Sequence, residues 1–161
     1  MNTQANVNTG AQQPLTMHFI GNLLTFHVRS AQTSGKVTLI ETRTLAGQGS
    51  PPHRQTDDEI FYVLEGQYEF FVNGERQLKS VGEAIHIVPG TIHAFRNPGP
   101  DTARMLIINA PGGLHEGFFM EVGEDVSANP AVFPPLTPPD VPAIIASAMK
   151  HEIEILPPTA A

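Results

Sequence analysis

Two histidines, one carboxylate and one amide in this chain have the residue types and the spacing of a single metal site. His53 and Gln55 stand two residues apart, and Glu59 follows four residues after Gln55. His93 comes three residues after Gly90, a residue type that permits a tight turn. Two imidazoles with one carboxylate are also the ligand set that leaves open positions for O2 and a substrate on Fe(II). The pattern therefore predicts one divalent metal ion held by His53, Gln55, Glu59 and His93.

Gln55 is the ambiguous member of this set, because an amide can act there in three ways. Its Oε1 can bind the metal, although a neutral amide oxygen is a weaker donor than an imidazole nitrogen for the later first-row metals. It can instead stand back and hydrogen-bond a water molecule or substrate on the metal. It can also merely fill space. The sequence leaves these roles open, together with the identity of the metal among Fe, Mn, Ni, Zn and Cu.

Strand geometry explains how these residues could converge. Successive side chains of a strand point to opposite faces, so His53 and Gln55 can point the same way. Glu59 opens an apolar stretch, and His93 must come from a neighbouring strand. Residues that share the parity of Glu59 or His93 should then line the pocket beside the metal. These predicted pocket residues are Phe61, Val63 and Phe95.

The remaining histidines are predicted to lie outside the metal site. His86 stands between two isoleucines and faces away from them, so it could line the pocket or be a surface or structural residue. The others lack a partner at ligand spacing and are predicted to lie on the surface. They are His18, His27, His115 and His151.

Short apolar or alternating segments, separated by turn residues, fill the middle of the chain. Asn73-Gly74 is the clearest hairpin signal, because both residue types tolerate the positive φ of a type I′ turn. Several short strands at this spacing predict an all-β sandwich or barrel. The expected strands are 23–29, 37–45, 59–64, 68–72, 84–88, 94–96 and 103–109.

The two ends of the chain differ from this middle part. Residues 1–16 are polar and predict a flexible arm or an exchanged edge strand, whereas the β-barrel should occupy 17–126. Residues 127–161 form a proline-rich connection, a short helix and a tail. The helix should run from Val141 to Lys150 with Asp140 as its N-cap.

Composition narrows the class of protein further. The net charge is −7, and the basic residues are scattered, which argues against a nucleic-acid partner. The chain has no cysteine, so disulfides and thiolate ligands are excluded. No apolar run is long enough to span a membrane, and the first residues do not resemble a signal peptide. We therefore expect a cytoplasmic protein with no membrane partner.

The segments at 51–75 and 82–97 together resemble a single-domain cupin of the quercetin dioxygenase-like group. The resemblance extends over about residues 20–158 and implies an all-β fold, the double-stranded β-helix or jelly-roll barrel, with a short C-terminal helix. It implies that His53, Glu59 and His93 are metal ligands. Gln55 stands where most metal-binding cupins carry a histidine. Val88 stands where proline is usual, which should alter a turn rather than the site.

The resemblance implies a metal-dependent dioxygenase that acts on a small aromatic or enolic substrate, with Glu59 also serving as a base. Non-redox chemistry, such as isomerisation or decarboxylation, is the alternative within the enzymes. A cupin that binds a small ligand without turnover, or one that has lost its metal, is the alternative outside them. A homodimer is expected, because open sheet edges need covering.

Overall fold

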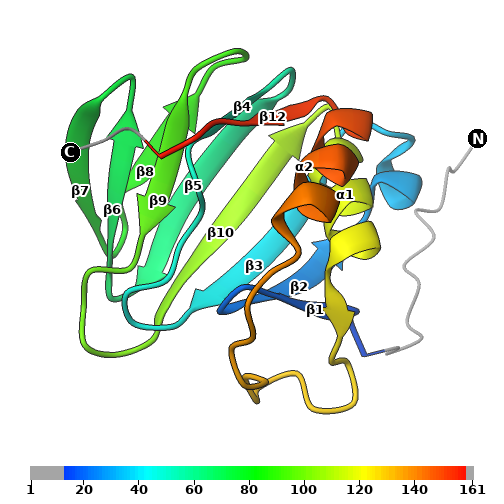
Figure 1. Cartoon of the computed structure of the whole chain (residues 1–161), viewed down its shortest axis with the longest axis horizontal. Coiled ribbons are helices and arrows are strands. Elements are labelled where there is room, and N and C mark those ends of the chain that lie inside the picture. Colours follow the sequence, from blue (N-terminus) through cyan, green and yellow to red (C-terminus); the bar gives the residue numbers. More distant parts are fainter. Residues whose placement is uncertain (1–12, 159–161) are drawn as a thin grey trace, which may run out of the picture.

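The computed structural model describes residues 13–158, and its strands form two antiparallel sheets that pack face to face (Figure 1). The predicted N-terminal arm, 1–16, therefore lies almost wholly outside the described residues. The larger sheet has the strand order β11 (Glu124–Asp125), β1 (Thr16–Phe19), β2 (Asn22–Val28), β3 (Thr38–Thr44), β10 (Ala103–Ala110), β5 (Asp58–Glu65), β8 (Ala84–Ile87). The smaller sheet has the order β12 (Ile153–Ile155), β4 (His53–Gln55), β9 (His93–Arg96), β6 (Gln67–Val72), β7 (Glu75–Ser80). This is the predicted all-β jelly roll.

All seven expected strands are present within a residue or so of their predicted bounds. The predicted hairpin is confirmed, since Asn73 and Gly74 have φ of 50° and 82° and join β6 to β7. Five further strands were not predicted by residue range: β1, β4, β7, β11 and β12. The shared parity of His53 and Gln55 implied β4, and the Asn73-Gly74 hairpin implied β7. The strands β1, β4, β11 and β12 have four residues or fewer, too short for a clear alternation, and their pairing with neighbouring strands identifies them.

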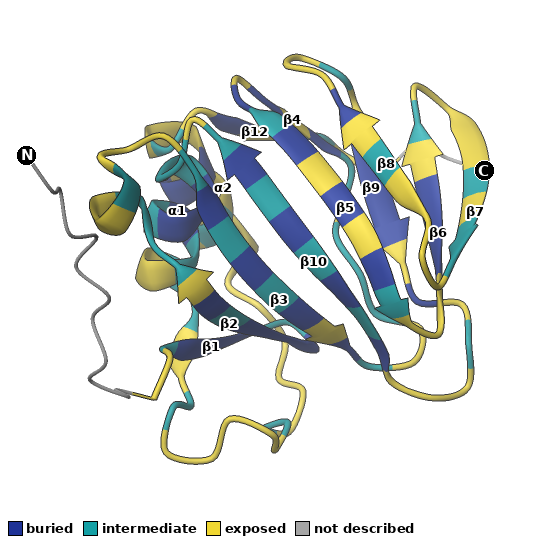
Figure 2. Ribbon diagram, turned by 180° about the vertical axis from the view of Figure 1, so that it is seen from behind, coloured by how far each residue is buried: buried dark blue, intermediate teal, exposed yellow. Residues whose placement is uncertain are grey.

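The core lies between the two sheets and is built from every second residue of the long strands. Figure 2 shows this alternation as bands of buried and less buried residues along β5 and β10. Three phenylalanines from three strands meet in the middle: Phe61 lies 5.0 Å from Phe70 and 5.8 Å from Phe95, measured between ring centroids. Such tilted aromatic contacts stabilise the core beyond the area that they bury.

Two helices, α1 (Leu114–Val122) and α2 (Val141–Lys150), close one end of the sheet sandwich (Figure 1). The predicted bounds of α2 are confirmed, and Asp140 caps it by accepting a hydrogen bond from the Ala143 N–H at 3.1 Å. The helix α1 was not predicted, because Gly112, Gly113 and Gly117 hide its pattern. A second apolar cluster of Phe118, Ala148 and Ile153 holds both helices against the barrel.

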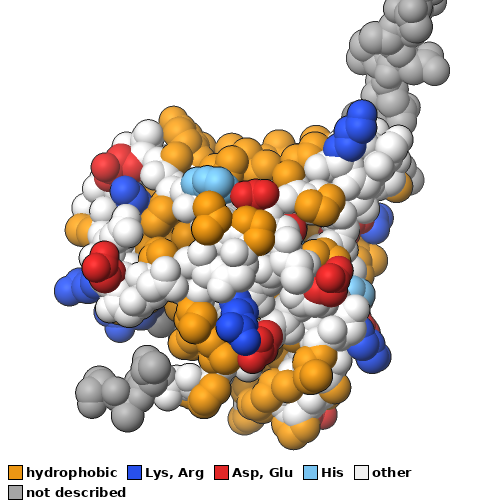
Figure 3. Space-filling view, turned by 90° about the horizontal axis from the view of Figure 1, so that it is seen from above, with side chains coloured by type: hydrophobic (Ala, Val, Ile, Leu, Met, Phe, Trp, Pro, Cys, Tyr) orange, Lys and Arg blue, Asp and Glu red, His pale blue; other side chains and the backbone are white. Residues whose placement is uncertain are grey.

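Two observations describe the surface formed by residues 13–158. No helix within 13–158 is long and apolar enough to cross a membrane. Seen from above, basic side chains stand singly among acidic and apolar ones (Figure 3). This distribution agrees with the scattered charges of the sequence.

Candidate metal centre

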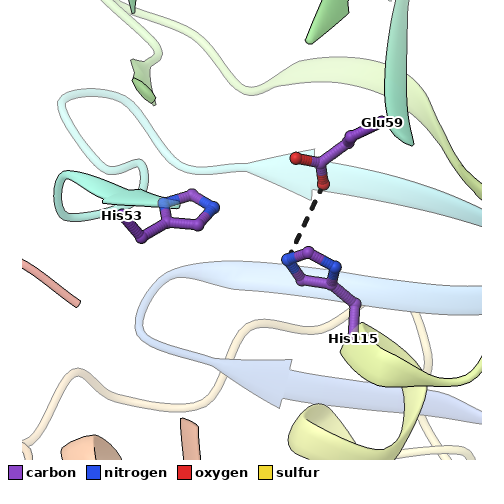
Figure 4. A group of neighbouring side chains, drawn as sticks. All are labelled: His53, Glu59 and His115. Carbon is purple, nitrogen blue, oxygen red and sulfur yellow. Dashed lines mark ion pairs between the residues drawn. The ribbon is translucent and has the colours of Figure 1, made fainter. Parts of the chain in front are cut away.

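A cluster of buried polar side chains lies between the two sheets, where α1 packs against them. Strand β4 supplies His53, β5 supplies Glu59, β9 supplies His93, and α1 supplies His115. His53 and His93 are direct partners in the β4–β9 pairing, and their ring centroids are 4.3 Å apart. Figure 4 shows the side chains of His53, Glu59 and His115 pointing toward one another from three different elements. The fold thus brings together residues that the sequence separates widely.

Glu59 is the centre of this cluster and is 2% exposed. Its Oε2 lies 2.9 Å from His93 Nε2 and accepts a hydrogen bond from Gln55 Nε2 at 2.8 Å. Its Oε1 lies 3.8 Å from His115 Nε2 and accepts a long hydrogen bond of 3.4 Å from Asn109 Nδ2. No lysine or arginine of the described chain takes part, so histidines are the only cationic partners that this carboxylate can have here.

Backbone carbonyls fix the tautomers of two of these histidines. His53 Nδ1 lies 2.9 Å from the Pro51 carbonyl oxygen, and His93 Nδ1 lies 2.9 Å from that of Thr91. Because a carbonyl oxygen only accepts, both Nδ1 atoms carry a proton, and a neutral ring then has a lone pair on Nε2. The Nε2 of His93 faces the Glu59 carboxylate, which is also an acceptor. A shared proton or a cation resolves this conflict.

The electrostatics of the cluster favour a ligand set over an ordinary buried network. Burial, aided by the charge of His93, lowers the pKa of His53 to about 3, so this imidazole is neutral at physiological pH. Burial alone would raise the pKa of Glu59, but His115 and His93 outweigh it and lower the value to about 2. For His115, burial is outweighed by the charges of Glu59 and Asp57, and its pKa is raised. An ionised carboxylate thus faces an imidazole lone pair.

The distances between donor atoms are close to those around a single first-row cation. Two donors that each lie about 2.1 Å from an ion are about 3.0 Å apart at a right angle and about 4.2 Å apart across it. The donor atoms of His53, Glu59 and His115 all lie within 4.8 Å of one another. The 2.9 Å separation of His93 from Glu59 corresponds to adjacent ligands. The residues present therefore fit a divalent ion.

Two buried groups beside the cluster have unused hydrogen-bonding capacity. Gln55 turns its Nε2 toward Glu59, and its Oε1 is buried without a partner. Asp57 is 0% exposed, and neither of its carboxylate oxygens has a hydrogen bond. The nearest cationic group to Asp57 is His115, with Nδ1 at 3.7 Å from Oδ2. Burying an acceptor without a hydrogen-bond partner costs free energy. Such groups are typical of a site where a bound ligand supplies the missing partners.

A narrow cavity of about 60 Å³ opens beside His53, Glu59 and His115. Of the predicted wall residues, Phe61 and Phe95 line this cavity, whereas Val63 is buried in the core and does not line it. The rest of the wall is mainly apolar and includes Phe19, Leu24, Ile107, Phe118 and Phe119. No lysine or arginine among the described residues lines it. Its polar lining consists of His53, Glu59 and His115 together with Asn22 and Ser50.

The prediction that His115 lies on the surface was wrong: its side chain is buried at 5% exposure within the cluster. Its partner Glu59 is distant in sequence, so no local spacing revealed the contact. A helical reading of 114–122 would have placed His115 on the same face as Phe118 and Phe119. His18 is also buried rather than exposed, and it accepts a hydrogen bond from the Gly21 N–H. His86 is exposed, pairs with Asp58 at 2.7 Å, and lies away from the cavity.

Comparison with known proteins agrees with this architecture. The Cupin domain family matches residues 41–109, which include three of the four histidines and acids of the cluster, so this part of the chain is similar to cupin domains. Quercetin 2,3-dioxygenase of Bacillus subtilis is 27% identical over 103 residues, 63% of this chain and 29% of that protein. An uncharacterized protein of Methanocaldococcus jannaschii is 30% identical over 82 residues, 50% of this chain.

The chain spans less than two thirds of the length of both relatives, 29% and 66% respectively. Among solved structures, a predicted oxalate decarboxylase from Thermotoga maritima superposes with a TM-score of 0.57 at 18% identity. The superposition covers 60% of this chain and 93% of that one. At this identity the likeness shows the shared fold, and function has to be argued from the site.

Proposed function

We propose that this protein is a metal-dependent dioxygenase acting on a small aromatic or enolic compound, with a divalent ion held by His53, Glu59 and His93. The proposal rests on one observation. The neutral imidazole of His53 and the ionised carboxylate of Glu59 point toward one another at the end of an apolar cavity. The 27% identity to quercetin 2,3-dioxygenase over 103 residues supports the reaction class. The ion would be Fe, Mn, Ni, Zn or Cu, since the ligands are imidazole and carboxylate.

The residues of the site have distinct tasks in this proposal. A bound ion of this kind would polarise substrate oxygens and, if redox-active, bring O2 and substrate together. Glu59 also accepts a hydrogen bond from a substrate hydroxyl. The neighbouring histidines hold the pKa of Glu59 to about 2, so this carboxylate is a weak base. It therefore orients the substrate hydroxyl but does not readily hold the proton that the hydroxyl loses. Gln55 donates to Glu59 and so fixes the plane of the carboxylate.

The cavity sets the class of substrate. A volume of about 60 Å³ corresponds to about four water-sized spaces. Since Phe61, Phe95 and Phe119 form its walls, a flat ring is favoured over a branched chain. Among the described residues no lysine or arginine lines the cavity, which argues against a second acidic group at its far end. A single-ring catechol or a short enolised diketone fits this description.

Non-redox chemistry is the second candidate, and the amide at position 55 favours it. Gln55 supplies no imidazole to the ion, so the metal would be less electron-rich than with a further histidine. A Lewis acid needs no such electron density and could serve an isomerase or a decarboxylase. A protein that binds a small ligand without turnover is the third possibility within the same site.

Oxygen uptake separates these candidates. The protein would be stripped of metal, loaded with Fe, Mn, Ni, Zn or Cu, and supplied with catechols, enols and diketones. We expect O2 consumption with at least one redox-active metal, absent in Glu59→Gln and retained in His27→Ala, a change of an exposed histidine on β2. Metal binding without O2 consumption across the panel would remove the dioxygenase and leave the non-redox candidates. Absence of metal binding would remove the metal-dependent proposal altogether.

A homodimer remains the expected assembly. β8 and β7 are end strands of the two sheets, and unpaired strand edges are usually covered in native proteins. Light scattering at micromolar concentration tests this expectation. A stable monomer would contradict it without affecting the metal site.

A further inference from the structure

We infer that His115, carried by α1 and held by Asp57, supplies the imidazole donor that position 55 lacks, so that the metal ion fastens α1 over the cavity. This inference rests on the proposed metal site and adds to it a ligand, a positioning residue and a mechanical consequence. The Nε2 of Gln55 donates to Glu59 at 2.8 Å, so position 55 presents hydrogens rather than a lone pair to the cluster.

His115 occupies the opposite side of the same carboxylate. Its Nε2 lies 3.8 Å from Glu59 Oε1, and its ring centroid lies 6.0 Å from that of His53. The donor atoms of these three residues lie within 4.8 Å of one another, close to the span of ligands around one ion. With His93 on the Oε2 side, the barrel and α1 together offer three imidazoles and one carboxylate. The third imidazole therefore comes from a helix outside the barrel.

Asp57 explains how His115 would keep the correct nitrogen free. An imidazole that binds a cation through Nε2 carries its proton on Nδ1 and needs an acceptor there. Asp57 Oδ2 lies 3.7 Å from His115 Nδ1, and both oxygens of Asp57 are buried without a hydrogen bond. In this structure Asn109 Nδ2 donates to the same Nδ1 at 3.1 Å, so that nitrogen is an acceptor here. Binding a cation through Nε2 would require this hydrogen bond to break and the Nδ1 proton to be donated to Asp57 instead.

The location of His115 gives the ion a structural effect. Helix α1 also carries Phe118 and Phe119, which line the cavity. Gly112 and Gly113 join the helix to β10, and Gly112 lies against the backbone of Val37 and donates to the Gly35 carbonyl oxygen at 2.9 Å. A bond from the ion to His115 thus joins α1 to strands β4, β5 and β9. Loading the site with metal is expected to order the helix that closes the substrate cavity.

A double-mutant cycle tests the ligand. The affinity for Zn2+ would be measured by competition with a chromophoric chelator in the wild type, His115→Ala, Gln55→His and the double variant. Loss of His115 should weaken binding about 10- to 100-fold, and adding Gln55→His should restore most of it. His27→Ala is the control and should bind as the wild type does. Equal affinity in His115→Ala and the wild type would overturn the inference while leaving the barrel site intact.

Hydrogen exchange tests the fastening of α1. Zn2+ should slow amide exchange across residues 114–122 in the wild type at least several-fold. The double variant should bind Zn2+ but show no slowing there, because its added imidazole lies on β4. If α1 is protected equally in the double variant, the ion does not hold the helix through His115. If the wild type binds no Zn2+, the proposed metal site fails first and this inference with it.

Asp57 is tested by a pair of substitutions of similar size. Asp57→Asn keeps an oxygen acceptor for His115 Nδ1, whereas Asp57→Val removes it. We expect Asp57→Val to weaken Zn2+ binding about tenfold and Asp57→Asn to retain most of the affinity. Both variants would be compared at equal folded fraction by circular dichroism. Similar losses in both would show that Asp57 acts through its charge or through packing, and its positioning role would be rejected.

Discussion

Two buried glutamates in this fold have opposite surroundings. Glu69 on β6 is 1% exposed and forms ion pairs with Arg76 and with Arg96, the latter at 3.0 Å. Glu59 on β5 is 2% exposed and has histidines, an amide and no arginine around it. The charge of Glu69 is balanced by side chains that are always cationic. In the described chain, the groups that can balance the charge of Glu59 are all histidines, which are titratable.

This difference separates a structural carboxylate, Glu69, from the proposed metal ligand, Glu59. The arginines over Glu69 are half-exposed, so their charged ends remain hydrated while they cover it. Such an arrangement stabilises the sheet and leaves no room for an added ion. Around Glu59, the cationic partner is replaceable: a proton on a histidine and a divalent metal can serve in turn. The comparison predicts that changes at the two glutamates affect different measurements.

The largest expected effect is on metal affinity at Glu59. Glu59→Gln removes the only negative charge in direct contact with His93, and we expect Zn2+ binding to weaken roughly 100-fold or more, about 2.7 kcal/mol. Glu69→Gln should leave it unchanged, because its arginine pairs lie on another face of the sheet. Competitive chelator titration of both variants measures the two values. Equal weakening of Zn2+ binding in the two variants would contradict the distinction between Glu59 and Glu69.

The next effect is a pH dependence of the metal-free protein. The pKa of His53 is about 3 in the folded protein and 6.5 ordinarily. Between these two pH values the unfolded chain binds a proton on His53, whereas the folded chain does not. The stability contributed by neutral His53 is full above pH 6.5 and is lost as the pH falls from 6.5 toward 3. Between pH 7 and 5 this loss should be about 2 kcal/mol. Urea unfolding should show the stability difference between the wild type and His53→Asn shrinking by that amount.

The next effect is on stability at Glu69. We expect Glu69→Gln to lower the free energy of unfolding by about 1–3 kcal/mol, the worth of hydrogen bonds to a charged group. The two arginines can be hydrated once released, which limits the loss. Urea unfolding at pH 7 measures it. A loss below the error of the method would mean that Arg76 and Arg96 cover Glu69 without stabilising it.

The smallest effect is expected at an exposed pair beside the metal site. Arg54 Nε lies 2.6 Å from Glu154 and both side chains are about half-exposed. Arg54→Ala should cost no more than about 1 kcal/mol of stability, as exposed pairs usually do. Metal affinity should stay within twofold of the wild type, since backbone pairing holds β4 in place. A larger change in affinity would show that the surface pair positions His53.

The sequence allowed some of this to be predicted because the signals were local. Alternation along β5 placed Glu59 and Phe61 on one face, and the Asn73-Gly74 turn and the Asp140 cap depend on neighbouring residues. The contact of His115 with Glu59 depends on α1 crossing the end of the barrel, which no short spacing encodes. The burial of Glu69 was equally hidden, since its arginines come from β7 and β9.

The pairing of β4 with β12 has a consequence for the order in which the molecule assembles. The strand of His53 lies between β9 and β12, and the Arg54–Glu154 contact joins residues 100 positions apart. The Leu156 N–H donates to the Pro52 carbonyl oxygen on the same side. During synthesis, the strand of His53 therefore emerges long before the segment that covers its outer edge. A ribosome-bound chain would hold the three barrel ligands on an unfinished sheet, and nascent protein would capture metal less tightly than released protein.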